Sequence, residues 1–494
     1  MLTRLQVDGF KNLVGVDVRF GPFTCIAGAN GVGKSNLFDA IRFLSALAHV
    51  PLVEAALLVR DEDGKSGDIR SLFHRVGDVH DQSMQFVAEM VVPPEGLDEL
   101  GQKAEATNTF LRYTIRLTYR ADDSLRALGS LEIQEEKLEH INRSEASAHL
   151  LFPHSAATWR KSVLKGRRTS PYISTELDNG QKVVRLHQDG GSSGRPISRP
   201  AASLPRTVIS ATNAAESPTA LIAKQEMRAW RLLQLEPSAL RQPDKFTAST
   251  ALEPDGSHLP ATLYCLSRAH PGKDGQLTEA ETYVRVANRL AELIDDVAKV
   301  WIDRDDRREL LTLMVSSKDG TIHPARALSD GTMRFLALAV LELDLRATGV
   351  LCLEEPENGI HPERIPKILQ LLQDIATDAE LEVDGDNPLR QVIINTHSPA
   401  VVQQVPEDSL VVAELKDKVQ AGQRFKCVSF GCLPGTWRSR NPGEPSHSGP
   451  ILAKGQLLAY LNPVPHDLAA GSAAQKKRVI DRKDLTPMIP GLAL

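Results

Sequence analysis

The sequence of 494 residues has few cysteines and no long uninterrupted apolar run. Its five cysteines lack the short spacings of metal ligands, and an odd, sparse set argues against a disulfide framework. The opening residues, MLTRLQVDGF, lack the apolar core of a signal peptide, and no stretch is apolar for long enough to span a bilayer. We therefore expect a cytoplasmic protein with reduced thiols and no membrane contact.

A strong excess of either charge is also lacking. The formal net charge is -5, with 24% charged and 41% hydrophobic residues, which is ordinary for a globular chain. Contact with nucleic acid would therefore need a local basic patch. Residues 143–206 contain one candidate, with the basic side chains Lys161, Lys165, Arg167, Arg168, Arg195 and Arg199. A solvated loop is the alternative, since charge runs are usually solvated and no aromatic residues are interleaved with this one.

The hydrophobic pattern alternates between strands and helices at both ends of the chain. The first part predicts strands at 2–8, 15–20, 23–28, 84–92, 112–120 and 130–138, with a helix at 35–48. The later part predicts a strand at 310–317, a helix at 329–345, a strand at 350–355, a helix at 363–376 and a strand at 391–397. Between them, 214–235 and 278–301 have helical spacing. We expect the two ends to build one sheet around a helical insertion.

The stretch GANGVGKS at residues 28–35 fits the pattern G-x-x-x-x-G-K-[ST], between an apolar strand and an amphipathic helix. Its glycines let successive backbone N–H groups converge on a phosphate chain, and the start of the helix adds a favourable dipole. In this pattern Lys34 reaches the β- and γ-phosphates and the Ser35 hydroxyl binds Mg²⁺. The strand and helix on either side argue against a chance glycine turn.

The strand VLCLEE at 350–355 ends in two adjacent carboxylates, Glu354 and Glu355, which buried strands do not normally carry. A Mg²⁺ at a phosphate-binding loop needs an acidic contact from a neighbouring strand end, and hydrolysis needs an oriented water. We therefore expect Glu354 to bind the metal and Glu355 to polarise the water. Two solvated glutamates at an exposed strand end are the alternative.

Two further features, a helix start and a histidine, could each contact a phosphate. In ALSDGTMRFLAL, Ser329 is a good helix cap and Gly331 allows close backbone approach, so this helix start is ready for an anion. One nucleotide needs only one such cradle, which implies a ligand on another subunit; an ordinary capped helix is the alternative. His397 follows an apolar strand and can reach a γ-phosphate from there, although a lone histidine at a strand end is often structural.

These stretches, in this order, resemble the ABC-type ATPase head family, in the branch of SMC-like, RecF-like and OLD-type (AAA_21-like) ATPases. GANGVGKS matches the Walker A loop, VLCLEE the Walker B strand, LSDGT the signature motif, ENGIHP the D-loop and NTHSP the switch histidine. LQVDGFKNL is similar to the family's opening strand. The resemblance covers about residues 1–95 and 310–405. It departs from the family at Glu354, where Asp is usual, and at the Q-loop glutamine, for which Gln82 and Gln85 lie in the right region without a convincing context.

The resemblance implies a site and a fold. Its implied nucleotide contacts are Lys11, Asn12, Asn30, Gly31, Gly33, Lys34, Ser35, Asn36 and, from a second head, Ser329 and Gly331. Ser35 and Glu354 would bind Mg²⁺, and Glu355, His397 and Lys34 would act in catalysis. The implied fold is α/β, a P-loop NTPase of ABC-ATPase type with a mixed sheet, an antiparallel β subdomain and a helical insertion.

We expect four segments. They are an N-terminal ATPase lobe at 1–206, the helical insertion at 207–309, a C-terminal ATPase lobe at 310–415 and an extension at 416–494. The extension is rich in Pro, Gly and Ser and ends in a mixed-charge stretch with Lys476, Lys477 and Arg478, typical of an appended tail.

The function implied is that of a Mg²⁺-dependent ATPase that converts ATP to ADP and phosphate and forms a homodimer or higher homo-oligomer through its nucleotide sites. The compact insertion favours the OLD-like branch, in which such a head is the sensor and scaffold for a separate effector, a nuclease or toxin, in antiphage defence. The alternative is a DNA repair or maintenance ATPase of RecF or SMC type that clamps DNA. A transport motor is a third interpretation, for which no membrane-coupling surface can be identified.

Overall fold

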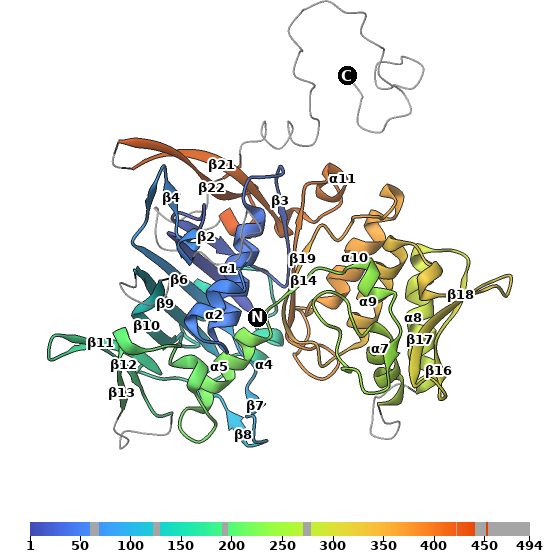
Figure 1. The fold of residues 1–494 in the computed structure, drawn as a ribbon, viewed down its shortest axis with the longest axis horizontal. Coiled ribbons are helices and arrows are strands. Elements are labelled where there is room, and N and C mark those ends of the chain that lie inside the picture. The colour runs from blue at the N-terminus through green and yellow to red at the C-terminus, as the bar shows by residue number, and fades with distance from the viewer. Residues whose placement is uncertain are drawn as a thin grey trace, which may run out of the picture. The chain divides into compact units, whose positions relative to one another are not determined.

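A computed structural model describes residues 1–59, 69–121, 129–189, 196–269, 278–420, 422–439 and 451–452. Residues Met1–Ala453 form one unit, and the elements below belong to it (Figure 1). Arg195, Lys476, Lys477 and Arg478, which the sequence singles out as basic, lie outside the described residues.

A six-stranded sheet joins distant parts of the chain. Its strands in spatial order are β14 (Arg231–Leu233), β19 (Gly349–Glu354), β20 (Arg390–Thr396), β3 (Phe23–Ala27), β21 (Leu410–Gln420) and β22 (Gln423–Cys432). The first five are parallel and β22 is antiparallel to β21, so the sheet is mixed. The inner strands β3, β19 and β20 are buried along almost their whole length, as expected for a parallel sheet covered on both faces. The prediction that both ends of the chain share one sheet is confirmed.

A second, eight-stranded sheet is antiparallel throughout. Its order is β13 (Ile197–Pro200), β12 (Gln181–Leu186), β11 (Ile173–Asp178), β10 (Ser130–His140), β9 (Phe110–Arg120), β6 (Ser83–Val91), β1 (Leu2–Asp8) and β2 (Val16–Arg19). Residues of β10 alternate between buried and half-buried along most of the strand, because one face packs on the core and the other is open. This sheet is the predicted antiparallel β subdomain.

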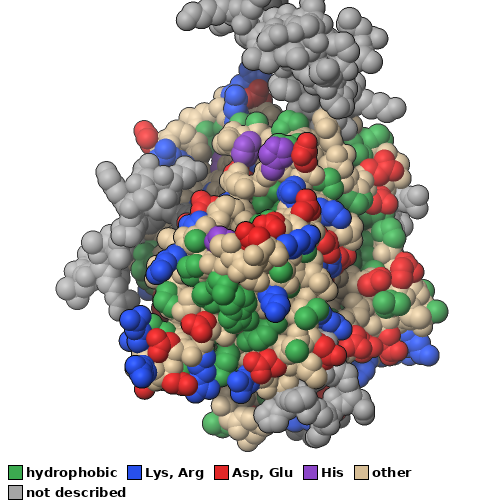
Figure 2. Space-filling view, turned by 90° about the vertical axis from the view of Figure 1, so that its right-hand side faces the viewer, with side chains coloured by type: hydrophobic (Ala, Val, Ile, Leu, Met, Phe, Trp, Pro, Cys, Tyr) green, Lys and Arg blue, Asp and Glu red, His purple; other side chains and the backbone are tan. Residues whose placement is uncertain are grey.

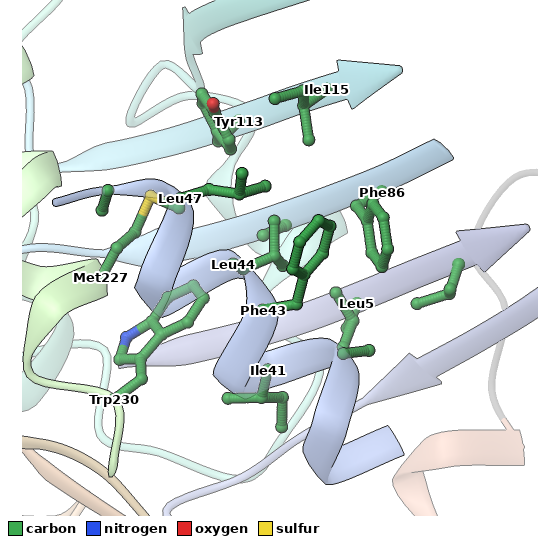
Figure 3. Close-up of a cluster of buried hydrophobic side chains, with 14 of the residues drawn as sticks. Leu5, Ile41, Phe43, Leu44, Leu47, Phe86, Tyr113, Ile115, Met227 and Trp230 are labelled. Atoms are coloured by element: carbon green, nitrogen blue, oxygen red, sulfur yellow. The ribbon is translucent and has the colours of Figure 1, made fainter. Parts of the chain in front are cut away.

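Helix α1 (Lys34–Leu47) packs against the antiparallel sheet through a large apolar cluster (Figure 3). Phe43 lies with its ring centroid 5.5 Å from that of Phe86 on β6, and Leu44 and Leu47 point to the same cluster. Helices α2 (Leu52–Leu57) and α5 (Pro218–Arg228) lie beside α1. Because α1 is buried along nearly its whole length, its first residues are held in a fixed position.

The other face of the central sheet is covered by α9 (Asp330–Leu343) and α10 (Ile365–Ile375) (Figure 1). Beyond them lie α7 (Leu259–Arg268), α8 (Glu279–Leu293) and a small sheet of β15 (Asp244–Lys245), β16 (Val297–Asp305), β17 (Leu310–Ser317) and β18 (Ile322–Pro324). The remaining elements are α3 (Ala146–His149), α4 (Trp159–Val163), α6 (Pro237–Leu240), α11 (Pro399–Val402), β4 (Arg75–Val76), β5 (Val79–His80), β7 (Glu95–Leu97) and β8 (Lys103–Glu105).

The buried guanidinium of Arg390 ties the C-terminal ends of α9 and α10 together. Its Nε donates to Ile375 O at 2.6 Å and its Nη1 to Leu341 O at 2.9 Å. Burial lowers the pKa of Arg390 to about 10, so the group stays charged at neutral pH. A cation at two helix C-termini satisfies carbonyls that lack helical partners and complements both helix dipoles.

The end predicted for the helix at 214–235 is wrong. Helix α5 stops at Arg228, and the three residues Arg231–Leu233 form β14 instead. They pair in parallel with Leu351–Leu353 of the buried strand β19, and this pairing overrides the helical spacing of the segment.

The helix predicted at 278–301 is also too long. Helix α8 ends at Leu293, and Val297–Asp305 form β16. Strand β16 pairs with β17 over almost its full length, and the β-branched and aromatic residues Val300, Trp301 and Ile302 suit that pairing. The predicted insertion thus contributes strands to two sheets as well as helices.

Strand β21 crosses residue 415, where the sequence predicts the start of the extension. Strand β22, which lies in the predicted extension, places Val428 and Phe430 in the main core. The division of the chain into four segments stays a prediction.

The face of the molecule seen in Figure 2 carries acidic and basic side chains interspersed with apolar ones, without a large patch of one sign. Within the described ranges, every helix is too short or too polar to span a bilayer.

Strand β6 carries a buried carboxylate, Glu89, that interacts with Arg112 and His149. The Glu89 side chain is only 1% exposed, Arg112 Nη2 donates to its Oε1 at 2.9 Å, and His149 Nδ1 lies 3.0 Å from its Oε2. Burial acts to raise the pKa of Glu89. The hydrogen bond and charge of His149, with the charges of Arg112 and Arg4, outweigh burial and lower this pKa to about 2.

Replacing Glu89 should destabilise the protein in a pH-dependent way. Because the pKa of Glu89 falls from 4.5 to about 2 on folding, its stabilising contribution is present above the higher value and is lost as the pH falls towards the lower one. We expect Glu89→Gln to lower the free energy of unfolding by about 3 kcal/mol at pH 7, and by clearly less at about pH 3. Urea denaturation at both pH values measures the difference.

The exposed Glu105, paired with Lys103 on the surface, supplies a matched control. Glu105→Gln should change the free energy of unfolding by less than about 0.5 kcal/mol. Equal effects of the two substitutions, or a Glu89→Gln effect that does not change with pH, would contradict the prediction.

Candidate nucleotide-binding site

A cavity of about 660 Å³ lies at the carboxyl ends of β3, β14, β19 and β20. Ligands of open α/β sheets generally bind at this edge. The predicted site residues on its wall are Lys11, Asn12, Asn30, Gly31, Gly33, Lys34, Ser35, Asn36, Glu354 and Glu355. The wall does not include Ser329, Gly331 or His397.

The glycine loop before α1 has the backbone that its sequence predicts. Gly31 and Gly33 have φ values of 77° and 102°, in the left-handed region that favours glycine. A Cβ on Gly33 would lie 2.2 Å from Asn12 Nδ2, so the loop also needs glycine for close approach. Asn12 Nδ2 donates to Val32 O at 3.2 Å, and Asn36 Nδ2 donates to Asn12 Oδ1 at 2.9 Å. Asn12 therefore braces the loop from the neighbouring segment.

Two lysines on the cavity wall differ in their partners. Lys34 Nζ donates to Gly28 O at 2.7 Å and Ala29 O at 2.9 Å, while Lys11 Nζ lies 3.0 Å from Asp39 Oδ2. Burial lowers the pKa of Lys34, and the carboxylates of the cavity, Glu355 first among them, act in the opposite direction. Among the described residues, the hydrogen-bond partners of the Lys34 ammonium are these two neutral carbonyls, a suitable arrangement for meeting a phosphate.

Glu354 is held at the end of β19 by amides from the two adjacent strands. Gln234 Nε2 donates to Glu354 Oε2 at 3.3 Å, and Asn395 Nδ2 donates to Glu354 Oε1 at 3.4 Å. Residue 234 directly follows β14, and residue 395 is the register partner of Glu354 on β20. Parallel pairing therefore sets where this carboxylate lies.

Glu355 adopts a left-handed backbone, with φ of 46°. Such strain in a residue other than glycine is concentrated at functional sites. Its backbone N–H donates to Asn395 O at 3.0 Å. Its side chain is held from both sides, because Asn358 Nδ2 donates to Oε2 at 2.9 Å and His397 Nδ1 lies 2.6 Å from Oε1. Glu355 and His397 thus form a hydrogen-bonded pair.

His397 follows β20, as predicted. It is not on the cavity wall but bonds Glu355, which is. Its predicted contact with a γ-phosphate stays a prediction.

Ser329 and Gly331 form the start of α9, outside the cavity wall. Ser329 caps the helix, since its Oγ accepts from Thr332 N at 3.2 Å. A Cβ on Gly331 would lie 2.3 Å from Gly359 O, so this glycine lets the helix approach the segment after Glu355. Their predicted role at the site of another subunit stays a prediction.

Sequence reasoning missed Gln234 and Asn395. Gln82 and Gln85, its glutamine candidates, do not line the cavity, and Gln85 Oε1 accepts from Arg116 Nη2 at 2.5 Å. Gln234 lines the cavity and bonds Glu354, but the helical spacing predicted for its segment hid its place after a strand. Asn395 had a usable signal, because it is a polar residue near the end of an apolar strand, two residues before His397.

The donor set suits Mg²⁺. The Ser35 hydroxyl, the Glu354 carboxylate and the Gln234 amide oxygen are hard oxygen ligands on one cavity. Within the ranges that the structure covers, no group of three or more His, Cys, Asp and Glu side chains is arranged to hold a metal. A few protein oxygens supplemented by phosphate and water are typical of Mg²⁺ in phosphoryl-transfer sites.

Comparison with known proteins gives a family match over much of the chain. The family model described as "AAA domain, putative AbiEii toxin, Type IV TA system" matches residues 23–152 and 223–403. DNA replication and repair protein RecF of Parabacteroides distasonis is 38% identical over 65 residues, which are 13% of this chain and 18% of that protein. RecF of Porphyromonas gingivalis is 44% identical over 46 residues, 9% of this chain and 13% of that protein. The chain thus matches less than a fifth of the length of these relatives.

Two solved structures are similar at low identity. One is an Smc head bound to the C-winged helix domain of ScpA, with a TM-score of 0.42 and 12% identity over 86% of this chain and 97% of that one. The other is the SMC head domain from Thermotoga maritima, with a TM-score of 0.36 and 11% identity over the same shares of the two chains.

The close approach at Gly331 yields a stability prediction. Gly331→Ala should lower the free energy of unfolding by about 1–3 kcal/mol, because its methyl group meets a backbone carbonyl that must shift. Gly385→Ala is the control, since no heavy atom lies within 4 Å of a Cβ placed there, and it should stay within about 0.5 kcal/mol of wild type. Chemical denaturation measures both. An unchanged Gly331→Ala protein would show that α9 and the Gly359 segment are not packed as described.

Proposed function

The chain belongs to the family described as "AAA domain, putative AbiEii toxin, Type IV TA system", and from that premise we propose that it is a Mg²⁺-dependent ATPase. The observation that carries the proposal is a single cavity. Its wall joins Lys34 and Ser35 at the start of α1 to Glu354 and Glu355 at the end of β19. A triphosphate in this cavity would meet a lysine, oxygen ligands for a metal and a candidate for activating water.

The proposed roles follow from the contacts of each side chain. The backbone N–H groups of the glycine loop and the Lys34 ammonium bind the β- and γ-phosphates. Ser35, Glu354 and Gln234 would hold Mg²⁺, which would supply charge neutralisation on the phosphate oxygens. Glu355, oriented by Asn358 and His397, accepts a hydrogen bond from the attacking water. As the water oxygen bonds to the γ-phosphorus and the bond to the β-phosphate oxygen breaks, Glu355 takes the proton and ADP leaves.

A second copy would complete the site. Ser329 and Asp330 are exposed at the start of α9 and lie outside the cavity of their own chain. A helix start with an exposed serine and a close-packed glycine suits a phosphate of another subunit. We therefore propose a homodimer, or a higher homo-oligomer, that closes on bound ATP.

The biological role that we propose is control of a separate effector, a nuclease or toxin, in antiphage defence. A DNA repair or maintenance role is a second candidate, and the local match to RecF favours it. The basic segment at 161–168 adds little support, because Arg168 donates to Ser170 O and Gln188 O and lies 4.1 Å from the Tyr172 ring. Salt-dependent DNA binding by the purified chain would favour the second candidate, and nucleotide-controlled release of a bound effector the first.

Removing the proposed water-activating carboxylate should trap the substrate. Glu355→Gln should lower the rate of ATP hydrolysis by about 100-fold or more, because an amide cannot accept the proton, while ATP stays bound. Phosphate release measures the rate, and light scattering with ATP should show a larger share of dimer than in wild type. The exposed Glu363 gives the control, since Glu363→Gln should hydrolyse at the wild-type rate. Rapid turnover by Glu355→Gln would refute the proposed role.

Removing the loop lysine should weaken nucleotide binding itself. Lys34→Ala should lower the affinity for a fluorescent ATP analogue by about 10- to 100-fold, because charge-assisted bonds to phosphate are lost. Lys367, exposed on α10, provides the matched Lys367→Ala control, with unchanged affinity. Equal affinity of Lys34→Ala and wild type would mean that ATP binds elsewhere.

A further inference from the structure

Arg334 lies on α9, one turn after the start of the helix, and its side chain lines the cavity. None of the roles proposed above uses it. The residue is half-buried, and within the described residues its guanidinium forms no ion pair with a carboxylate. The role of Arg334 must therefore come from its other contacts near the cavity.

The Arg334 guanidinium bonds the backbone of two separate loops. Its Nε donates to Leu235 O at 3.1 Å, and its Nη1 donates to Asn358 O at 2.8 Å. Leu235 lies in the segment after β14, and Asn358 lies in the segment after β19. A planar guanidinium has donors that diverge in fixed directions, which suits two acceptors on different loops, whereas a lysine ammonium is a flexible point charge.

Each of these loops supports one carboxylate of the site. Gln234, next to Leu235, donates to Glu354 at 3.3 Å. The side chain of Asn358, whose carbonyl Arg334 binds, donates to Glu355 at 2.9 Å. Both carboxylates are therefore supported by residues that a single side chain of α9 fixes in place.

We propose that Arg334 is a positioning residue that couples the orientation of α9 to the orientation of Glu355 and Glu354. This inference rests on the proposed ATPase function and adds a path within one chain. When the start of α9 meets a phosphate of another subunit, the helix carries Arg334 with it. The segments at 234–235 and 355–358 then move together, and Glu355 reaches its working position only in the closed dimer.

The first test needs no nucleotide. Hydrogen–deuterium exchange of the backbone amides at 355–360 should become about tenfold faster in Arg334→Ala than in wild type, because the bond to Asn358 O is lost. The control is Arg326→Ala, an exposed arginine shortly before α9. It should exchange like wild type. Equal exchange in Arg334→Ala and Arg326→Ala overturns the inference, whether or not the chain hydrolyses ATP.

The second test separates positioning from simple stability. Arg334→Ala should lower kcat by about 10- to 100-fold and leave KM within about threefold, because misplaced catalytic groups slow the reaction of bound substrate. Arg334→Lys keeps the charge and protects folding, but it should recover only part of kcat. A loss of nucleotide affinity that matches a fall in Tm, with kcat restored by lysine, would instead indicate a merely structural role and overturn the inference.

A double-mutant cycle with Asn358 completes the design. Asn358→Ala removes the amide that holds Glu355 and keeps the backbone carbonyl that Arg334 binds. If Arg334 acts through Asn358, the double variant should have a kcat within about twofold of the slower single variant. Additive losses would refute that path. A wild-type chain without ATP hydrolysis would refute the proposed function, and the exchange comparison would then decide this inference alone.

Discussion

The site depends above all on the parallel pairing of β14, β19 and β20. These strands come from three separate stretches of the chain, and the polar side chains of Gln234, Glu354 and Asn395 lie at or just after their ends, at the same edge of the sheet. The register that pairs Glu354 with Asn395 brings the amide and the carboxylate within bonding distance. A shift of one residue in either pairing would turn the carboxylate to the other face of the sheet and separate it from the loop that carries Lys34.

Packing on both sides of the sheet keeps that edge rigid. Helix α1 is buried between the two large sheets, and α9 and α10 cover the opposite face. This enclosure explains how Glu355 can hold a left-handed backbone, since bonds from Asn358, His397 and Asn395 fix it from three directions. The buried sheet and helices fix the positions of the site residues, and the short loops at the strand ends carry their polar side chains. This arrangement is suited to precise chemistry.

Much of the site could be predicted from the sequence because its signals are local. The glycine loop and the paired glutamates are short patterns whose neighbours already indicate a strand and a helix. Gln234 and Arg334 could not be found in this way, because their importance arises from strands and loops that meet only in the folded chain. The overlong helices at 214–235 and 278–301 have the same origin, since pairing with distant strands decided where each helix ended.

Arg390 provides an anchor for the C-terminal end of α9. Because its guanidinium binds carbonyls at the C-terminal ends of both α9 and α10, that end of α9 is anchored to the sheet. The opposite end is held by contacts outside the sheet, where Arg241 binds Leu328 O and Asp330 and Gly359 packs on Gly331. The helix has 14 residues and is thus about 21 Å long, so a tilt of only about 5° around the anchor would displace Ser329 by nearly 2 Å. Arg334, five residues nearer the anchor, would move about two-thirds as far, so a small tilt of α9 would shift both the exposed start of the helix and the side chain on the cavity wall.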